Sequence, residues 1–159
     1  MFPAGMCITG KIFKHVLLVL ACADCAVALK VKYHDCGSQS GTVKWVKVEP
    51  CDNPKDCSLI RGQWVYFYLA FVPKEVATRV KAVAYGIVNF VRVRIPLPNS
   101  NACQNSGLAC SLSPGRPYKF RTDMEIKKSY PIMNVRIRVE LLDQNMKKLA
   151  CIVMRAHTV

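Results

Sequence analysis

Apolar and charged residues alternate along several short stretches of this chain. The alternation is strict in residues 91–95 and 135–141, where valine and isoleucine alternate mainly with arginine, and it is looser in residues 43–48. A repeat of two residues places one set on a buried face and the other in water, which is typical of a β-strand. Further candidate strands are residues 63–72, 80–84 and 149–154.

Turn-forming residues gather between the candidate strands. Glycine, proline, asparagine, aspartate and serine cluster in residues 37–41, 52–54, 98–101, 113–115 and 143–145. These residue types supply the backbone conformations of tight turns. About seven short strands separated by such turns predict an all-β domain, a two-sheet antiparallel β-sandwich. At 159 residues the chain has room for one such domain and little more.

The first 28 residues have the pattern of a cleaved secretory signal peptide. Lys11 and Lys14 precede an apolar run, and Ala26-Val27-Ala28 has the small residues that signal peptidase accepts. A short membrane anchor is the alternative, although a membrane-spanning helix needs roughly 20 apolar residues. We expect cleavage after Ala28, because an earlier cut after Ala23 would leave Cys25 unpaired. The folded domain would then comprise residues 29–159.

Six of the nine cysteines remain after the expected cleavage: Cys36, Cys51, Cys57, Cys103, Cys110 and Cys151. An even number behind a secretory signal predicts a disulfide framework formed in an oxidising compartment. Two pairs are close in sequence, but sequence alone does not choose among the 15 possible pairings. Zinc binding is the weaker alternative, because only His34 and His157 remain and no Cys-x-x-Cys pair occurs.

The chain is strongly basic, with a formal net charge of +13, although 52% of its residues are hydrophobic. The hydrophobic content excludes a disordered basic tail. Six basic residues fall on the expected outward strand faces: Lys44, Lys47, Arg92, Arg94, Arg136 and Arg138. They would attract an anionic membrane by about 1 kcal/mol per group near the surface, or they simply keep the surface solvated. No nucleic-acid-binding motif occurs, so we expect no nucleic-acid partner.

Catalytic chemistry is not expected. The chain has no Gly-x-Ser-x-Gly nucleophile elbow, and its two remaining histidines lie near opposite ends of the domain. The six cysteines are expected to be disulfide-bonded, so none is left as a nucleophile. We therefore expect no catalytic residues, no metal and no cofactor.

An ordered set of motifs resembles the ML lipid-recognition family, which includes the Niemann-Pick type C2 proteins and the group 2 mite allergens. The motifs lie at residues 33–38, 48–51, 61–63, 95–98, 101–103, 129–131, 139–143 and 149–151. The resemblance implies the disulfides Cys36–Cys151, Cys51–Cys57 and Cys103–Cys110. It also implies an immunoglobulin-like sandwich whose two sheets part to admit a lipid.

The resemblance and the uncharged strand faces together predict a lipid-binding cavity. Its expected residues are Val46, Val48, Phe67, Leu69, Phe71, Ala84, Val91, Val93, Ile95, Met124, Ile126, Tyr130, Pro131, Val135, Ile137 and Val139. Ile95 falls where the family's sterol carriers have a phenylalanine, and Val139 where vertebrate members have tryptophan, so a wider cavity or a different lipid is expected. Without the resemblance, periodicity alone would favour an ordinary filled core.

The resemblance implies a secreted or endolysosomal protein that binds and transfers one sterol or similar lipid. We expect a monomer that contacts an anionic membrane transiently, with a membrane receptor as a further candidate partner. Two alternatives stay open at this point. One is innate-immune recognition of microbial glycolipid, and the other is an extracellular carrier of fatty acids or semiochemicals.

Overall fold

The computed structural model describes residues 29–159, which form ten β-strands and contain no helix, so no helix in this part is long and apolar enough to cross a membrane. The expected signal peptide lies outside the described residues. The strands are β1 (Leu29–Lys30), β2 (Tyr33–Asp35), β3 (Gly41–Glu49), β4 (Cys57–Leu59), β5 (Trp64–Pro73), β6 (Lys81–Val88), β7 (Val91–Ile95), β8 (Tyr118–Glu125), β9 (Asn134–Leu142) and β10 (Lys148–Thr158).

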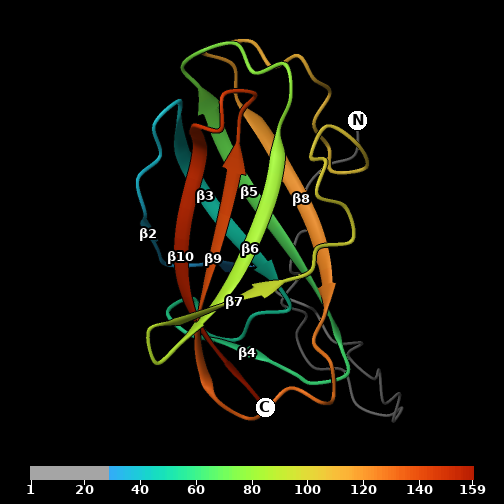
Figure 1. Ribbon diagram of the computed structural model, residues 1–159. Coiled ribbons are helices and arrows are strands. Elements are labelled where there is room, and N and C mark those ends of the chain that lie inside the picture. Colours follow the sequence, from blue (N-terminus) through green and yellow to red (C-terminus); the bar gives the residue numbers. More distant parts are fainter. Residues whose placement is uncertain (1–28) are drawn as a thin grey trace, which may run out of the picture.

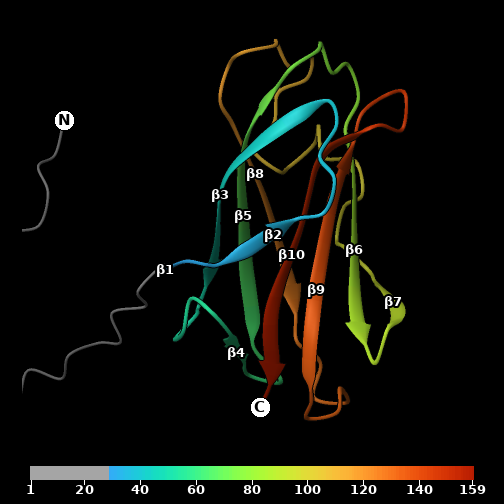
Figure 2. The same ribbon diagram turned by 90° about the vertical axis from the view of Figure 1, so that its left-hand side faces the viewer.

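Two sheets face each other in a sandwich (Figures 1 and 2). One sheet has the strand order β1-β3-β5-β8, and the other has the order β2-β10-β9-β6-β7 with β4 added beside β10. Adjacent strands are antiparallel except for β4, which runs parallel to β10. The prediction of an all-β, two-sheet sandwich is confirmed, with that one parallel pairing as an exception.

Most strands lie where the sequence placed them. Strand β7 has the expected bounds, and β3, β5 and β9 differ from expectation by one or two residues at their ends. Strand β6 begins at Lys81, so Val80 precedes it. Strand β8 was not expected, although Tyr118, Phe120, Thr122 and Met124 alternate there with charged residues.

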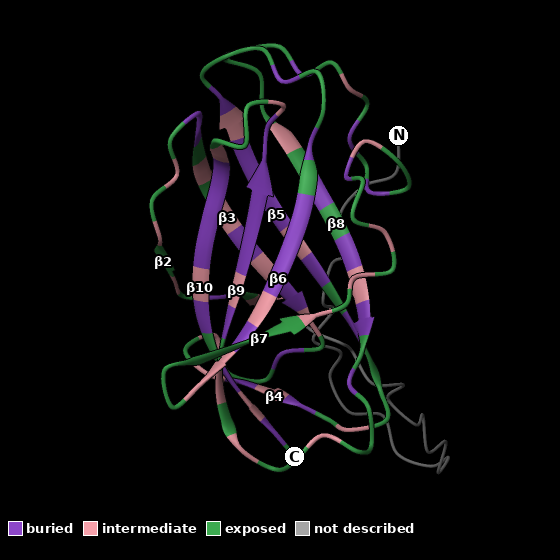
Figure 3. Ribbon diagram, in the orientation of Figure 1, coloured by how far each residue is buried: buried purple, intermediate pink, exposed green. Residues whose placement is uncertain are grey.

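A single cluster of buried apolar side chains fills most of the space between the sheets (Figure 3). The largest of these side chains lie toward one end, which we call the closed end: Leu69, Phe71, Leu112, Phe120, Leu141 and Leu149. All six are essentially inaccessible to water. Dense packing of this kind leaves no room for a ligand at the closed end.

Polar contacts fasten the two sheets together at the closed end. The buried Ser40 hydroxyl donates to Asp143 Oδ2 at 2.7 Å, and the Ser40 amide donates to the Lys148 carbonyl at 3.1 Å. Gly41 lies directly against the Leu149 carbonyl, where any side chain would collide with it. The absence of a Cβ therefore lets β3 and β10 approach closely across the sandwich.

Three disulfides, Cys36–Cys151, Cys51–Cys57 and Cys103–Cys110, join the pairs that the family resemblance implies. The first spans 115 residues and ties the segment after β2 to the middle of β10. Closing so long a loop restricts the unfolded chain more than closing a short one does. The other two close loops of only six and seven residues.

Candidate functional site

A cavity of about 350 Å³ lies between the sheets at the end opposite the packed phenylalanines, which we call the open end. This volume is at the lower end of the range of roughly 300–1,000 Å³ that small-molecule sites occupy. The lining residues are Leu59, Gly86, Val88, Val93, Arg94, Ile95, Met124, Ile126, Tyr130, Pro131, Met133, Val135, Ile137 and Thr158.

Small side chains on the inner faces create this cavity. Gly86 of β6 faces inward opposite Val93 of β7, and Val88 pairs with Val91 at the end of the same hairpin. A Cβ added to Gly86 would meet only Val135 and Ile95, at 3.5 and 3.8 Å, which are ordinary contact distances. The glycine therefore leaves empty a volume that a larger residue would occupy.

The lining is almost entirely aliphatic. Among the lining residues only Arg94, Tyr130 and Thr158 carry polar side-chain atoms. The Thr158 hydroxyl is already committed, because it donates to the Pro131 carbonyl at 2.5 Å and accepts from the Met133 amide at 2.9 Å. A ligand in this cavity would gain about 0.8 kcal/mol for each methylene it buries, less the cost of association.

The segment between β8 and β9, residues 126–133, forms one side of the cavity mouth. Arg61 fixes this segment: its guanidinium donates to the carbonyls of Tyr130 at 3.2 Å and Lys128 at 3.4 Å. Gly62, with a φ of +87°, donates to the Ile126 carbonyl and lies against Lys128. A side chain at Gly62 would be strained and would press on Lys128. The Arg61-Gly62 turn thus positions the segment from outside the cavity.

Half of the expected cavity residues line the cavity. These are Val93, Ile95, Met124, Ile126, Tyr130, Pro131, Val135 and Ile137. Seven others are buried in the filled core instead: Val46, Val48, Phe67, Leu69, Phe71, Ala84 and Val139. Val139 therefore does not widen this cavity, whereas Ile95 is one of its walls. Val91 is 62% exposed on the β6–β7 hairpin and lies outside the lining.

The alternating pattern failed to separate cavity from core because it marks only which way a side chain faces. Leu59, Gly86, Val88, Arg94, Met133 and Thr158 line the cavity but were not expected to do so. For Gly86 a signal was available, since a glycine inside a strand often marks a place where a ligand approaches the backbone. The contribution of Leu59 depends on the pairing of β4 with β10, which sequence did not reveal.

Exposed apolar side chains surround the mouth of the cavity. On the β6–β7 hairpin, Phe90 is 91% exposed, and Val91 and Val93 are also exposed. On the facing segment, Ile132 is exposed between two residues that line the cavity. Phe90 has a φ of +67°, which is uncommon for a bulky residue. The turn at the tip of this hairpin, two residues after the cavity-lining Val88, therefore presents a largely exposed aromatic ring.

A serine, a histidine and two aspartates meet where β4 runs beside β10. His157 Nε2 lies 3.1 Å from Ser58 Oγ, and its Nδ1 lies 3.2 Å from Asp56 Oδ2. The Ser58 hydroxyl, however, donates to Asp52 Oδ2 at 2.6 Å, so His157 must be the donor toward Ser58. A histidine that donates to the serine cannot remove its proton. The cluster therefore links β4 to β10 rather than activating a nucleophile.

Hydrogen bonds lower the pKa of two carboxyl groups in the turns. The Ser58 hydroxyl and amide hold the pKa of Asp52 below its ordinary value. At Asp35, burial acts to raise the pKa, but hydrogen bonds from Ser38 and Gly37 outweigh it and the net pKa is lowered. Both carboxylates stabilise turns next to disulfides. Within residues 29–159, no three His, Cys, Asp or Glu side chains are grouped so that they could hold a metal ion.

Comparisons with known proteins identify similar chains. Residues 30–158 match the family model of the ML domain. The chain is 37% identical over 136 residues to NPC intracellular cholesterol transporter 2 homolog a of Drosophila melanogaster, covering 84% of this chain and 92% of that protein. It is 34% identical over 134 residues to NPC intracellular cholesterol transporter 2 of Bos taurus, covering 84% and 89%. A crystal structure of a Niemann-Pick type C2 protein from the Japanese carpenter ant superposes with a TM-score of 0.76 at 24% identity, covering 80% of this chain and 99% of that one.

Proposed function

This chain belongs to the ML domain family, as its sequence motifs predicted, and we propose that it binds one sterol or similar lipid in the open-end cavity and transfers it. The observation that carries the proposal is the cavity itself. It lies between the sheets, its walls are aliphatic, and the hydroxyl of Thr158 on its wall is already hydrogen-bonded. Such a site favours a ligand that is apolar along most of its length.

The names of two relatives support a sterol as the ligand. The proteins from Drosophila melanogaster and Bos taurus are both named as intracellular cholesterol transporters. Tyr130 adds a hydroxyl to an otherwise aliphatic lining, so the single hydroxyl of a sterol would find a partner there; Arg94 alternates with the inward-facing Val93, and its guanidinium belongs to the outer face of the sheet. The ligand would bury its ring system among Val93, Ile95 and Ile137.

A direct test is to identify the lipid that the protein takes up. Residues 29–159, with the three disulfides formed, would be exposed to a mixed lipid extract and examined by native mass spectrometry. We expect one sterol per chain. A fatty acid at the same stoichiometry would favour the extracellular carrier, and a bound microbial glycolipid would favour immune recognition. A chain that takes up no lipid would contradict the proposal.

Two valines on one strand provide a matched pair for locating the site. Val93 and Val91 both lie on β7 and are 58% and 62% exposed, but only Val93 lines the cavity. A Val93→Asp substitution places a charge on the cavity wall, so we expect lipid affinity to fall about tenfold or more. Val91→Asp should leave affinity within about twofold. Equal losses in both variants would place the lipid elsewhere.

The rim of the mouth is the proposed membrane-docking surface for exchange of the lipid. Phe90 is exposed at the tip of the β6–β7 hairpin and Ile132 is exposed in the mouth segment, and basic residues including Arg92, Lys127 and Lys128 lie in the same two segments. Aromatic and aliphatic tips would enter the interface while the cations meet anionic headgroups. Phe90→Ser should therefore slow lipid transfer to vesicles containing phosphatidylserine without weakening lipid binding in solution. Unchanged transfer would remove the hairpin tip from the docking surface.

The same proposal covers location and assembly. Three disulfides suit an oxidising compartment, either the extracellular space or the lumen of the endolysosomal system. We propose that the protein acts there as a monomer and that a membrane receptor is a further partner. Analytical ultracentrifugation of the secreted protein would test the first statement, and a stable dimer would contradict it.

A further inference from the structure

The outer face of the sheet formed by β2, β10, β9, β6 and β7 carries two adjacent rows of arginines. One row crosses the sheet through Arg92, Ile87, Arg136 and Arg155, which are cross-strand neighbours in that order. The next row runs through Arg94, Tyr85 and Arg138. The rows use the positions on β9 that alternate with the cavity-lining residues Val135 and Ile137, so they lie on the opposite side of the sheet from the lipid.

Most of these arginines lack a carboxylate partner. Arg138 is paired with Glu140, but within the described residues none of Arg92, Arg94, Arg136 and Arg155 forms an ion pair. Arg136 and Arg155 are direct cross-strand neighbours. Like charges in that arrangement destabilise a sheet. The arrangement therefore costs stability and calls for a ligand that offsets the repulsion.

The other sheet shows what an outer face without such a ligand looks like. There Lys47 pairs with Glu49 at 3.0 Å, and Tyr68 donates to the same carboxylate. Lys119 and Arg121 of β8 share that strand with the acidic residues Asp123 and Glu125. Positive and negative charges are interspersed on that face, whereas they are segregated on the arginine face.

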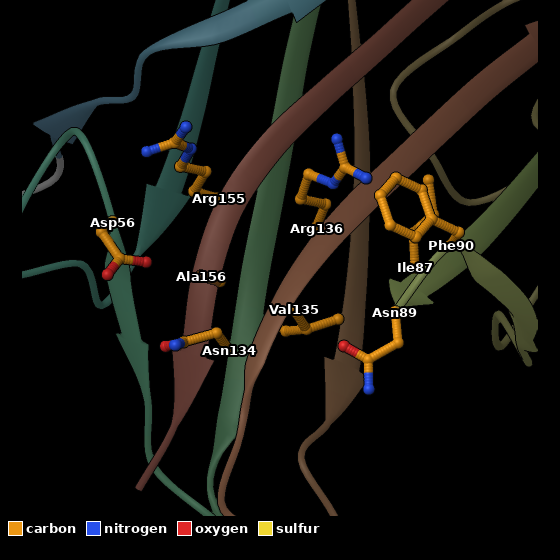
Figure 4. Close-up of a pocket in the computed structure, with 9 residues that line it drawn as sticks. All are labelled: Asp56, Ile87, Asn89, Phe90, Asn134, Val135, Arg136, Arg155 and Ala156. Atoms are coloured by element: carbon orange, nitrogen blue, oxygen red, sulfur yellow. The ribbon is translucent and has the colours of Figure 1, made fainter.

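The arginine face is hollowed rather than flat. Two hollows, of about 410 and 610 Å³, share Ile87, Arg136 and Arg155 and therefore form one continuous trough. Figure 4 shows Arg155 of β10 and Arg136 of β9 side by side in it, with the Phe90 ring next to Arg136. The ring is 5.9 Å from that guanidinium, a cation–π contact. The trough also includes Lys32, His34 and Lys55, and one acidic residue, Asp56, whose Oδ2 lies 3.2 Å from His157 Nδ1.

We propose that this trough binds a sulfated polysaccharide. The guanidinium fork matches the paired oxygens of a tetrahedral anion, and a row across four strands spans about 14 Å at 4.8 Å per strand, so it meets several anions of one chain. Asn89 and Asn134, which lie in the same trough, supply amide groups for sugar hydroxyls.

The surroundings of the trough disfavour the other polyanions. Its floor is the middle of a sheet, where the backbone groups are already hydrogen-bonded to neighbouring strands, so a peptide cannot be added as a strand. Arg136 and Arg155 belong to the inner strands β9 and β10, and the β6–β7 hairpin with Phe90 borders the trough. A slender chain reaches such groups more readily than a flat bilayer does. The proposal does not depend on the lipid cavity, but it shares Phe90 and Arg92 with the membrane-docking surface proposed above.

The test measures binding of heparin-derived oligosaccharides of defined length to residues 29–159 by isothermal titration calorimetry. The double substitution Arg136→Ala/Arg155→Ala should weaken binding about tenfold or more, because charged hydrogen bonds of this kind are the strong ones. The matched control is Arg116→Ala/Arg121→Ala, which removes the same charge from exposed arginines away from this face. The control should stay within about twofold of the parent chain.

Each outcome decides the matter. Equal weakening in both variants would show that net charge alone attracts the oligosaccharide, and this would overturn the proposal. A parent chain that binds no oligosaccharide would also overturn it. Polyglutamate and vesicles containing phosphatidylserine are tested as competitors of the oligosaccharide. If either displaces the oligosaccharide and loses affinity in the Arg136/Arg155 variant by the same factor, the trough is assigned to that partner instead. Chemical unfolding of every variant separates a folding defect from a lost polyanion site. The lipid stoichiometry of every variant in native mass spectra shows separately whether the lipid proposal holds.

Discussion

The two ends of the sandwich interior are built from the same strands but differ in the size of the side chains that meet there. At the closed end, the fully buried rings of Phe71 and Phe120 pack between the sheets. At the open end, the corresponding inner positions include Gly86 and Val135, and a cavity of about 350 Å³ remains. The comparison shows how one fold combines a rigid core with a binding site: the large residues are concentrated where the sheets are fastened together.

The largest effect is expected from shortening a side chain at the closed end. Phe71→Ala removes a fully buried ring and should lower the free energy of unfolding by about 3–5 kcal/mol. Folded molecules should still bind one lipid, because Phe71 does not line the cavity. Urea unfolding and native mass spectrometry measure the two effects. Phe90→Ala is the matched control, and its exposed ring should contribute little to stability; similar losses in both variants would contradict the division into two ends.

Filling the open end should abolish lipid binding without lowering stability, the opposite of the effect expected for Phe71→Ala. Gly86→Leu adds apolar atoms to the cavity and replaces a flexible residue in a strand, so we expect unchanged or slightly higher stability, by up to about 1 kcal/mol. Lipid binding should be lost. Ala84, two residues earlier on the same face, is 1% exposed in filled core, and Ala84→Leu should destabilise by about 1–3 kcal/mol. A Gly86→Leu variant that still binds lipid normally would show that the ligand lies elsewhere.

The smallest effect concerns acid. The pKa values of Asp35 and Asp52 are lowered in the folded protein, so each carboxylate stabilises the fold at pH values above its ordinary pKa of about 4. That contribution is complete at pH 5 and is lost only as the pH falls through the lowered pKa. We expect Asp52→Asn to reduce the pH dependence of the unfolding free energy below pH 4. Between pH 7 and pH 5 the pH dependence of the unfolding free energy should be the same in the variant and the parent chain. A change confined to the higher range would contradict the assignment.

The sequence predicted the sandwich well because the position of a strand, and the face on which each of its side chains lies, are set by the local sequence. Strict alternation in residues 91–95 and 135–141 reported the inner and outer faces correctly, and the family motifs implied the three disulfide pairs. Strand β8 was not predicted: Phe120 and Met124 alternate there with charged residues, but the polar Thr122 interrupts the set of apolar inward positions. The parallel β4–β10 pairing joins segments about 100 residues apart, and nothing local reveals it.

The cavity could be predicted only in part, since a void depends on how side-chain volumes add up across two sheets. Phe67 and Ile137 both face inward, yet one is core and the other is cavity wall. The difference lies in their neighbours: Gly86 is the cross-strand partner of Ile137. Arg61 was noted only as part of a family turn, whereas in the structure its hydrogen bonds position the mouth segment.

The two sides of the cavity mouth are held very differently, and this difference bears on kinetics. The segment of residues 126–133 is fastened by Arg61 from the turn before β5 and by Thr158 from β10. The opposite side is β7, an edge strand that is paired with β6 alone within residues 29–159. The rate of lipid exchange should therefore follow the opening of that single ladder. Amide hydrogens in residues 91–95 should exchange with solvent faster than those of β9, and a bound lipid should slow them most.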